Sequence, residues 1–249
     1  MNDRFLYLAV NIGTILFPLI FSFEKKIAYY RLWKFLIPAL FITATIFLIW
    51  DHYFTQLGYW GFNEQYITGN KLFNLPFEEI MFFFTIPYAS IFIYVFVNKF
   101  WPGSTFFNKI QKPVSIVILL IAIILLFTNF DKPYTALNCG YAIILILTQL
   151  LFIKGNYMGK FYRFYLWHLI PFVIVNGILT GTGINEEVVW YNKNAILGYR
   201  IGTIPIEDTL YSFSLMLMNI SIFEWLRGMG NRDKNQEPRI RSQESGFRK

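Results

Sequence analysis

Long apolar runs separated by short polar connections cover almost the whole chain as far as residue 226. Seven such runs are expected to form helices, at about 5–23, 35–50, 75–97, 113–130, 134–153, 164–182 and 204–226. Each comes close to the roughly 20 residues that an α-helix needs to cross a bilayer. Membrane strands are not expected, because stretches such as 114–127 show no alternation of polar and apolar residues. The pattern therefore predicts an all-α polytopic membrane protein with seven transmembrane helices.

Composition supports this class and excludes several others. Only 15% of the residues are charged, whereas water-soluble domains average about 25%. The first run has no small-residue cleavage site after it, so we expect a retained helix rather than a signal peptide. Cys139 is the only cysteine, which excludes an intramolecular disulfide, and His52 and His168 lack the spacing of metal ligands. No metal site is predicted.

The formal net charge of +7 is distributed unevenly over the connections between the runs. Of the 22 Lys and Arg residues, 17 lie in alternate connections and in the C-terminal tail, which leaves five on the other side. Basic connections favour the cytoplasm, so we expect a multi-pass protein of the cell membrane with its N-terminus outside and its C-terminus in the cytoplasm. Nucleic acid is not an expected partner, because no basic soluble domain is present. The polar segment 227–249 is expected to be a disordered cytoplasmic tail.

The chain contains an internal repeat. Residues 62–79 align with 191–208 without gaps at an offset of 129, and the identical pairs include Asn63 and Asn192, Gly69 and Gly198, Pro76 and Pro205, and Glu78 and Glu207. We predict one transmembrane domain over 1–226, composed of a first repeat (1–100), a connecting helix (101–133) and a second repeat (134–226). Each period contains four helices, so both copies face the same way and the repeat is parallel.

The formal charges within the predicted runs are all carboxylates: Glu78, Glu79, Glu207, Asp208 and Glu224. Ionisable residues in hydrocarbon are costly and usually mark a functional site. Four of them form a Pro-x-acid-acid motif that opens a run in each repeat. Proline and acids also suit the first turn of any helix, but the recurrence of the motif favours a site. Successive helical residues point about 100° apart, so one acid of each pair should face the interior, with Glu78 and Glu207 preferred. Glu224 is expected to pair with Arg227.

Carboxyl groups that are buried close together can act as general acid and general base on one substrate. Aromatic residues crowd around both motifs, and their ring faces stabilise cations, although an interfacial aromatic belt is the alternative. The sequence therefore favours carbocation chemistry on an apolar substrate. Lys71 and Arg200 could instead pair with the acids, which would weaken a general-acid role.

Five residues near the motifs are candidates for substrate binding: Asp51, Trp60, Asn63, Asn192 and Tyr211. Asp51 ends the second run and could join the acidic cluster, although it has no obvious counterpart in the second repeat. The asparagines could orient a carboxyl group or cap a loop.

The segments 17–26, 49–51, 58–63, 74–79 and 202–208 resemble the small integral-membrane lycopene β-cyclases in their fused two-subunit form. The resemblance covers residues 4–226, without the phytoene-synthase half of the fungal bifunctional enzymes. It implies an isomerase of carotenoid biosynthesis that converts lycopene to γ-carotene and then to β-carotene. It also implies catalytic roles for Glu78, Glu79, Glu207 and Asp208, without assigning acid or base.

The resemblance further implies that the substrate comes from the bilayer, with membrane lipids and other carotenoid-pathway enzymes as partners. No cofactor is expected, because no Gly-x-Gly-x-x-Gly turn follows a strand and the reaction is redox-neutral. One alternative is a hydratase that quenches the same cation with water. Another is a proton-coupled transporter. A retinal-binding protein is disfavoured, because residues 204–226 contain no lysine.

Overall fold

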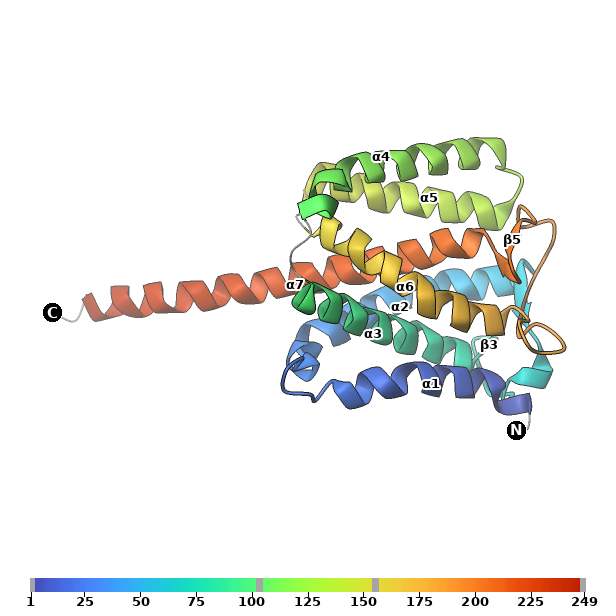
Figure 1. Cartoon of the computed structure of the whole chain (residues 1–249), viewed down its shortest axis with the longest axis horizontal. Helices are drawn as coiled ribbons and strands as arrows, with labels where there is room; N and C mark the ends of the chain where they lie inside the picture. The colour runs from blue at the N-terminus through green and yellow to red at the C-terminus, as the bar shows by residue number, and fades with distance from the viewer. Residues whose placement is uncertain (1–2, 102–104, 154–156, 247–249) are drawn as a thin grey trace.

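A bundle of long helices forms the molecule, with every strand at one of its ends (Figure 1). The computed structural model describes the backbone of residues 3–101, 105–153 and 157–246, and the side chains of these ranges except Thr105 and those after residue 229. The α-helices are α1 (Leu6–Phe21), α2 (Trp33–Gln56), α3 (Phe77–Phe100), α4 (Thr105–Thr128), α5 (Pro133–Thr148), α6 (Met158–Leu179) and α7 (Glu207–Gly246). A π-helical turn, Gln149–Ile153, extends α5. The predicted all-α class is confirmed.

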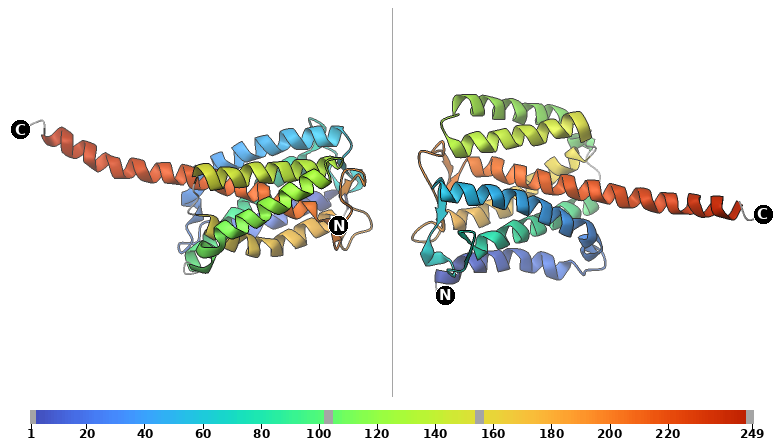
Figure 2. Two further views of the ribbon diagram at one scale, coloured as in Figure 1. Left: turned by 90° about the horizontal axis from the view of Figure 1, so that it is seen from above. Right: turned by 180° about the vertical axis from the view of Figure 1, so that it is seen from behind.

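Within the part of the chain that the structure describes, six segments are long and apolar enough to cross a membrane: Asp3–Phe21, Tyr29–Gln56, Phe77–Phe100, Phe106–Thr128, Pro133–Ile153 and Met158–Leu179. The predicted count of seven is not confirmed, because α7 is not among them. Its first half carries Ser212, Ser214 and Asn219, which are all buried. This helix runs among the other helices rather than at their margin (Figures 1 and 2), so its polar side chains contact protein.

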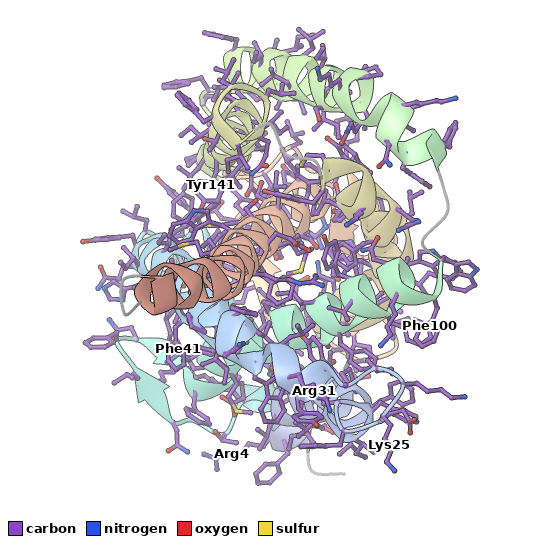
Figure 3. The ribbon with its side chains drawn as sticks, turned by 90° about the vertical axis from the view of Figure 1, so that its left-hand side faces the viewer. Arg4, Lys25, Arg31, Phe41, Phe100 and Tyr141 are labelled. Atoms are coloured by element: carbon purple, nitrogen blue, oxygen red, sulfur yellow. The ribbon has the colours of Figure 1, made fainter. Side chains whose placement is uncertain are left out.

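Large apolar side chains cover the outside of the bundle. Phe41 on α2 and Phe127 on α4 are 58% and 80% exposed, and Figure 3 shows Phe41 pointing away from the helices. Soluble monomers rarely expose apolar patches of such extent. This surface is suited to an apolar surrounding.

The short strands gather at the end of the bundle where the N-terminus lies, which we call the hairpin end (Figure 1). They are β1 (Trp60–Phe62), β2 (Lys71–Leu72), β3 (Leu75–Pro76), β4 (Val189–Tyr191), β5 (Arg200–Ile201) and β6 (Ile204–Pro205). β2 pairs with β3 and β5 with β6 as antiparallel hairpins, each directly before an acidic helix start. β1 pairs with β4, which joins the two distant chain segments.

Local contacts at the hairpin end recur at the offset of 129. The backbone N–H of Asn63 donates to the Val188 carbonyl at 2.9 Å, and the backbone N–H of Asn192 donates to the Tyr59 carbonyl at 2.8 Å. Gly69 and Gly198 have φ angles of +88° and +87°, a region that glycine enters without the steric cost of a Cβ. The two aligned segments thus share these hydrogen bonds and this glycine conformation.

Helix α6 begins earlier than the predicted residue 164, and this places a cation inside a helix. Arg163 is only 8% exposed. Its guanidinium donates to the Trp101 carbonyl and to the side-chain oxygen of Asn98 at the end of α3. Because the predicted run begins at residue 164, the sequence analysis placed Arg163 in the connection before it. Inside the bundle, the hydrogen bonds to Trp101 and Asn98 compensate the burial of its guanidinium.

Helix α7 continues to Gly246, and its second half projects beyond the other helices (Figure 1). The sequence predicted disorder from residue 227 onward. A helix that is already formed adds one hydrogen bond for each residue it gains, so its extension is far less costly than nucleation. The prediction of a disordered cytoplasmic tail itself stays a prediction.

Alanine in place of Gly159 is expected to lower stability by about 1–3 kcal/mol, as overpacking typically does. A Cβ at Gly159 would lie 2.3 Å from Oδ1 and 3.0 Å from the backbone nitrogen of Asn108 on α4. The measurement is thermal unfolding in detergent. Gly140→Ala on α5 is the matched control, because nothing lies within 4 Å of its Cβ position and alanine favours helix. Equal melting temperatures for the two variants would contradict a close contact between α4 and α6.

Candidate active site

The two acids of each motif point to different places. Glu79 at the start of α3 and Asp208 at the start of α7 line one cavity, and Glu78 and Glu207 do not. The sequence analysis preferred Glu78 and Glu207 as the residues that face the interior. All four side chains are buried, with 8% exposure at most. The roughly 100° step of the helix decides which acid reaches the cavity, and its phase could not be read from the sequence.

Glu78 and Glu207 instead hold the loops above their own helices. Oε1 of Glu78 accepts the backbone N–H of Thr68 at 2.8 Å, and Oε1 of Glu207 accepts that of Leu197 at 2.5 Å. Thr135 on α5 also donates its hydroxyl to Glu207 Oε1 at 2.8 Å. These hydrogen bonds hold the segments before the β2–β3 and β5–β6 hairpins against the starts of α3 and α7, where Glu79 and Asp208 lie.

The cavity encloses about 900 Å³ of space that no atom fills, part of which is open to the surroundings. Its described lining residues come from α1, α2, α3, α5, α6, α7 and the β1–β4 pair. Its walls include Phe82, Ile86, Phe172, Val175 and Leu215. None of the described residues that line it is Lys or Arg. An apolar ligand that develops positive charge would find complementary surroundings here.

Asp208 receives three neutral hydrogen-bond donors. Tyr134 on α5 donates its hydroxyl to Oδ1 at 2.6 Å. Tyr191 on β4 and Asn176 on α6 both donate to Oδ2 at 3.0 Å. Hydrogen bonds from neutral donors to both oxygens stabilise the ionised form of a carboxyl group.

The environment of Glu79 is poorer in donors. The Tyr7 hydroxyl on α1 donates to Oε2 of Glu79. Asp51 on α2 also lines the cavity, is 1% exposed, and interacts electrostatically with Glu79. Trp60 donates its indole N–H to Asp51 Oδ1 at 2.7 Å, and Asp51 Oδ2 is buried without a hydrogen-bond partner. Asp51 therefore belongs to the acidic cluster.

Tyr191 lies in the loop region at the hairpin end, and its hydroxyl stays protonated. Burial raises its pKa well above the usual value, and the negative charge of Asp208 adds to the shift. A tyrosine of this kind is a hydrogen-bond donor to Asp208 over the whole physiological pH range.

The five candidate substrate-binding residues fall into two groups. Asp51, Trp60 and Tyr211 line the cavity. Asn63 and Asn192 do not: each accepts the backbone N–H two residues later at 3.0 Å, and their side-chain amides donate to Glu186 and to the Gly58 carbonyl. Of the two roles that the sequence left open for these asparagines, the structure shows loop capping.

The basic residues near the motifs point away from the acids. Lys71 forms an ion pair with Glu64, and Arg200 donates to the Thr203 carbonyl at 2.5 Å. The predicted pair of Glu224 and Arg227 is confirmed, with 3.6 Å between Oε1 and Nη1.

Sequence reasoning missed the tyrosines Tyr7 and Tyr134, the amide Asn176 and the imidazole of His168. His168 lines the deeper part of the cavity, with Nδ1 3.2 Å from Ser90 Oγ and Nε2 2.8 Å from Ser212 Oγ. Because Ser90 donates its own proton to the Ile86 carbonyl, the proton on Nδ1 points to Ser90 Oγ. The imidazole links α6 to α3 and α7.

Metal ligation has no support from the side-chain arrangement. Among the described residues, no group of three or more His, Cys, Asp and Glu side chains is placed to hold a metal ion. Cys139 is buried and free of any disulfide.

The pattern of paired acids at two helix starts has a counterpart in known proteins. The family model described as "Lycopene cyclase" matches residues 4–97 and 131–226. The chain belongs to the lycopene cyclase family. The two matched segments of this family member contain both acidic motifs and all three carboxyl groups of the cavity. They leave out residues 98–130, which include the whole of α4.

Two curated relatives of this lycopene cyclase family member are fungal proteins named bifunctional lycopene cyclase/phytoene synthase. The chain is 32% identical to the one from Neurospora crassa over 72 residues, and 33% identical to the one from Phaeosphaeria nodorum over 58 residues. These stretches are 29% and 23% of the chain, but only 12% and 10% of the relatives. The matches therefore span about a tenth of the length of either relative. No solved structure matches the chain significantly.

Proposed function

We propose that this protein is a lycopene β-cyclase, an isomerase that closes β-ionone rings at the acyclic ends of lycopene. The observation that carries the proposal is the single apolar cavity into which Asp51, Glu79 and Asp208 project from three helices, with no Lys or Arg in its wall. Membership of the lycopene cyclase family supports the choice of substrate.

The reaction begins when a carboxyl group adds a proton to C2 of the acyclic end, which leaves a cation at C1. The C5–C6 double bond attacks C1, so that a C1–C6 bond forms and the positive charge moves to C5. A carboxylate then removes the proton from C6, and the electrons of that C–H bond form the C5–C6 double bond of the ring. One proton is gained and one is lost, so lycopene, γ-carotene and β-carotene have the same mass.

The cavity residues supply what these steps need. Carboxyl groups donate and accept the proton, and the ring faces of Trp60, Tyr191 and Tyr211 stabilise the cation. The apolar walls exclude water, which would otherwise capture the cation as an alcohol. We assign Glu78 and Glu207 to positioning, because their hydrogen bonds hold the loops beside Glu79 and Asp208.

We further propose that α7 crosses the membrane as a seventh span and that α1–α3 and α5–α7 are parallel copies. In support, Gly61 pairs with Trp190 at the centre of the β1–β4 ribbon, positions that the offset of 129 makes equivalent. Tyr7 and Tyr134, 127 residues apart, donate to the cavity acid of their respective halves. The hairpin end then faces outward and the basic connections face the cytoplasm, with lycopene entering from the bilayer.

Expression of the full chain in a host that accumulates lycopene is expected to yield γ-carotene and β-carotene. Chromatography separates the pigments and mass spectrometry shows whether their mass is unchanged. A product that is heavier by one water would identify a hydratase and overturn the cyclase proposal. Unchanged lycopene beside correctly inserted protein would also overturn it.

A further inference from the structure

The two cavity acids have unequal surroundings, although they occupy matching places in the two halves. Asp208 has three neutral donors on its two oxygens. Glu79 has the Tyr7 hydroxyl and a second carboxyl group, that of Asp51, as an electrostatic neighbour. In the second half the polar partner on α6 is an amide, Asn176, whereas in the first half the polar partner on α2 is an acid.

Asp51 cannot be explained as a structural ion-pair partner. It is 1% exposed, Trp60 occupies its Oδ1, and its Oδ2 is buried without a donor. The groups that face the pair from the other elements are Tyr7, Trp60, Tyr191 and Tyr211, which are all neutral donors. Two carboxylates that line one apolar cavity repel one another more strongly than they would in water. A shared proton removes the repulsion and gives the unpartnered oxygen a hydrogen.

We propose that Asp51 and Glu79 share one proton and together form the general acid, and that Asp208 is the general base. This assignment rests on the proposed cyclase function and divides the roles between the two halves of the chain. The hydrogen bonds to Asp208 suit a group that stays ionised, stabilises the cation and removes the C6 proton. The carboxyl pair suits a group that holds a proton and releases it to C2.

The assignment requires a proton return after each ring closure. The Asp51–Glu79 pair has lost a proton and Asp208 has gained one, so one proton must cross the cavity. Tyr211 lines the same cavity as the two groups and interacts electrostatically with Asp51, Glu79 and Asp208. Its hydroxyl can accept a proton from one side and release another to the other side. No external proton, oxidant or reductant is consumed.

Deuterium labelling separates the acid from the base. Full-length protein in membranes is incubated with lycopene in D₂O, and both product and recovered lycopene are analysed by mass spectrometry. In the wild type, each ring closure adds one deuteron at C2 and removes one hydrogen from C6. Asp51→Asn is expected to leave the recovered lycopene unlabelled, because C2 is no longer protonated.

Asp208→Asn is expected to give the opposite result. C2 still receives a deuteron, the ring cannot be completed, and the carboxyl pair takes a proton back from C2. Deuterium in the recovered lycopene should rise by about tenfold or more relative to Asp51→Asn. Tyr191→Phe removes one hydrogen bond to Asp208 Oδ2 at the end of β4, should show the same shift to a smaller degree, and keeps the test valid if Asp208→Asn does not fold.

The outcomes distinguish this inference from the cyclase function itself. Deuterium in the lycopene recovered from Asp51→Asn would overturn the division of roles. Its absence from the lycopene recovered from both Asp208→Asn and Tyr191→Phe would do the same. In either case, ring closure by the wild type would still support the cyclase function. Absence of ring closure in the wild type would overturn both. Tyr141→Phe is the control for Tyr191→Phe, because the Tyr141 hydroxyl contacts the sulfur of Met218 outside the cavity, and its recovered lycopene should be no more labelled than that of the wild type.

Discussion

Glutamine in place of Glu79 is expected to slow ring formation by about 10²–10⁴-fold, the usual contribution of general acid–base catalysis. The amide has nearly the same shape as the carboxyl group and can still accept the Tyr7 hydroxyl, but it cannot release a proton to the substrate. The measurement is the initial rate of γ-carotene formation by membranes that contain equal amounts of inserted protein.

Glu78→Gln is the matched control, because the same substitution is made one residue earlier on the same helix. The amide oxygen can still accept the Thr68 N–H, which is the hydrogen bond that Glu78 Oε1 makes. We expect this variant to keep most of the wild-type rate. If Glu78→Gln lost as much activity as Glu79→Gln, the division into a cavity acid and a loop-holding acid would be wrong.

Removal of both tyrosine hydroxyls from Asp208 should have an effect of similar size. Hydrogen bonds to charged groups contribute about 1.5–3 kcal/mol each, so Tyr134→Phe combined with Tyr191→Phe should cost about 3–6 kcal/mol. Each 1.4 kcal/mol corresponds to about a factor of ten in rate, which predicts a loss of about 10²–10⁴-fold. Steady-state rates of the double variant and of both single variants measure it.

Tyr141→Phe controls for the loss of a tyrosine hydroxyl elsewhere on α5. The Tyr141 hydroxyl contacts the sulfur of Met218 at 2.7 Å, and Tyr141 does not line the cavity. Its rate should stay near that of the wild type. A double variant that retains the rate of Tyr141→Phe would remove Asp208 from the reaction.

Much of the architecture follows from hydrophobicity alone, because apolar runs of sufficient length can satisfy their backbone in a membrane only as helices or closed barrels. Seven runs were predicted on this basis, and each corresponds to a helix, with the largest differences at the end of α2, the start of α4, the start of α6 and the end of α7. Helix α7 is not among the segments that are apolar enough to cross a membrane, and its buried Ser212, Ser214 and Asn219 lower its hydropathy. The start of α6 was misplaced because the charge of Arg163 is satisfied by α3.

The acidic motifs could be found because proline and carboxylates at a fixed spacing recur in both halves. The choice between adjacent acids could not be made, since it depends on the rotation of α3 and α7 about their axes. Tyr7, Tyr134 and Asn176 were missed because single polar residues in apolar helices carry no local pattern. A signal existed: Tyr7 and Tyr134 are 127 residues apart, close to the repeat offset, and each falls in the first turn of a helix.

Glu79 and Asp208 line the same cavity, so the symmetric substrate of the proposed reaction can place only one of its two ends there at a time. After the first ring has closed, the substrate must leave the cavity, reverse its direction in the surrounding lipid and bind again with its other end. Half-converted pigment should therefore escape and compete with fresh starting material, so that scarce enzyme enriches the one-ringed form and abundant enzyme drives conversion to completion.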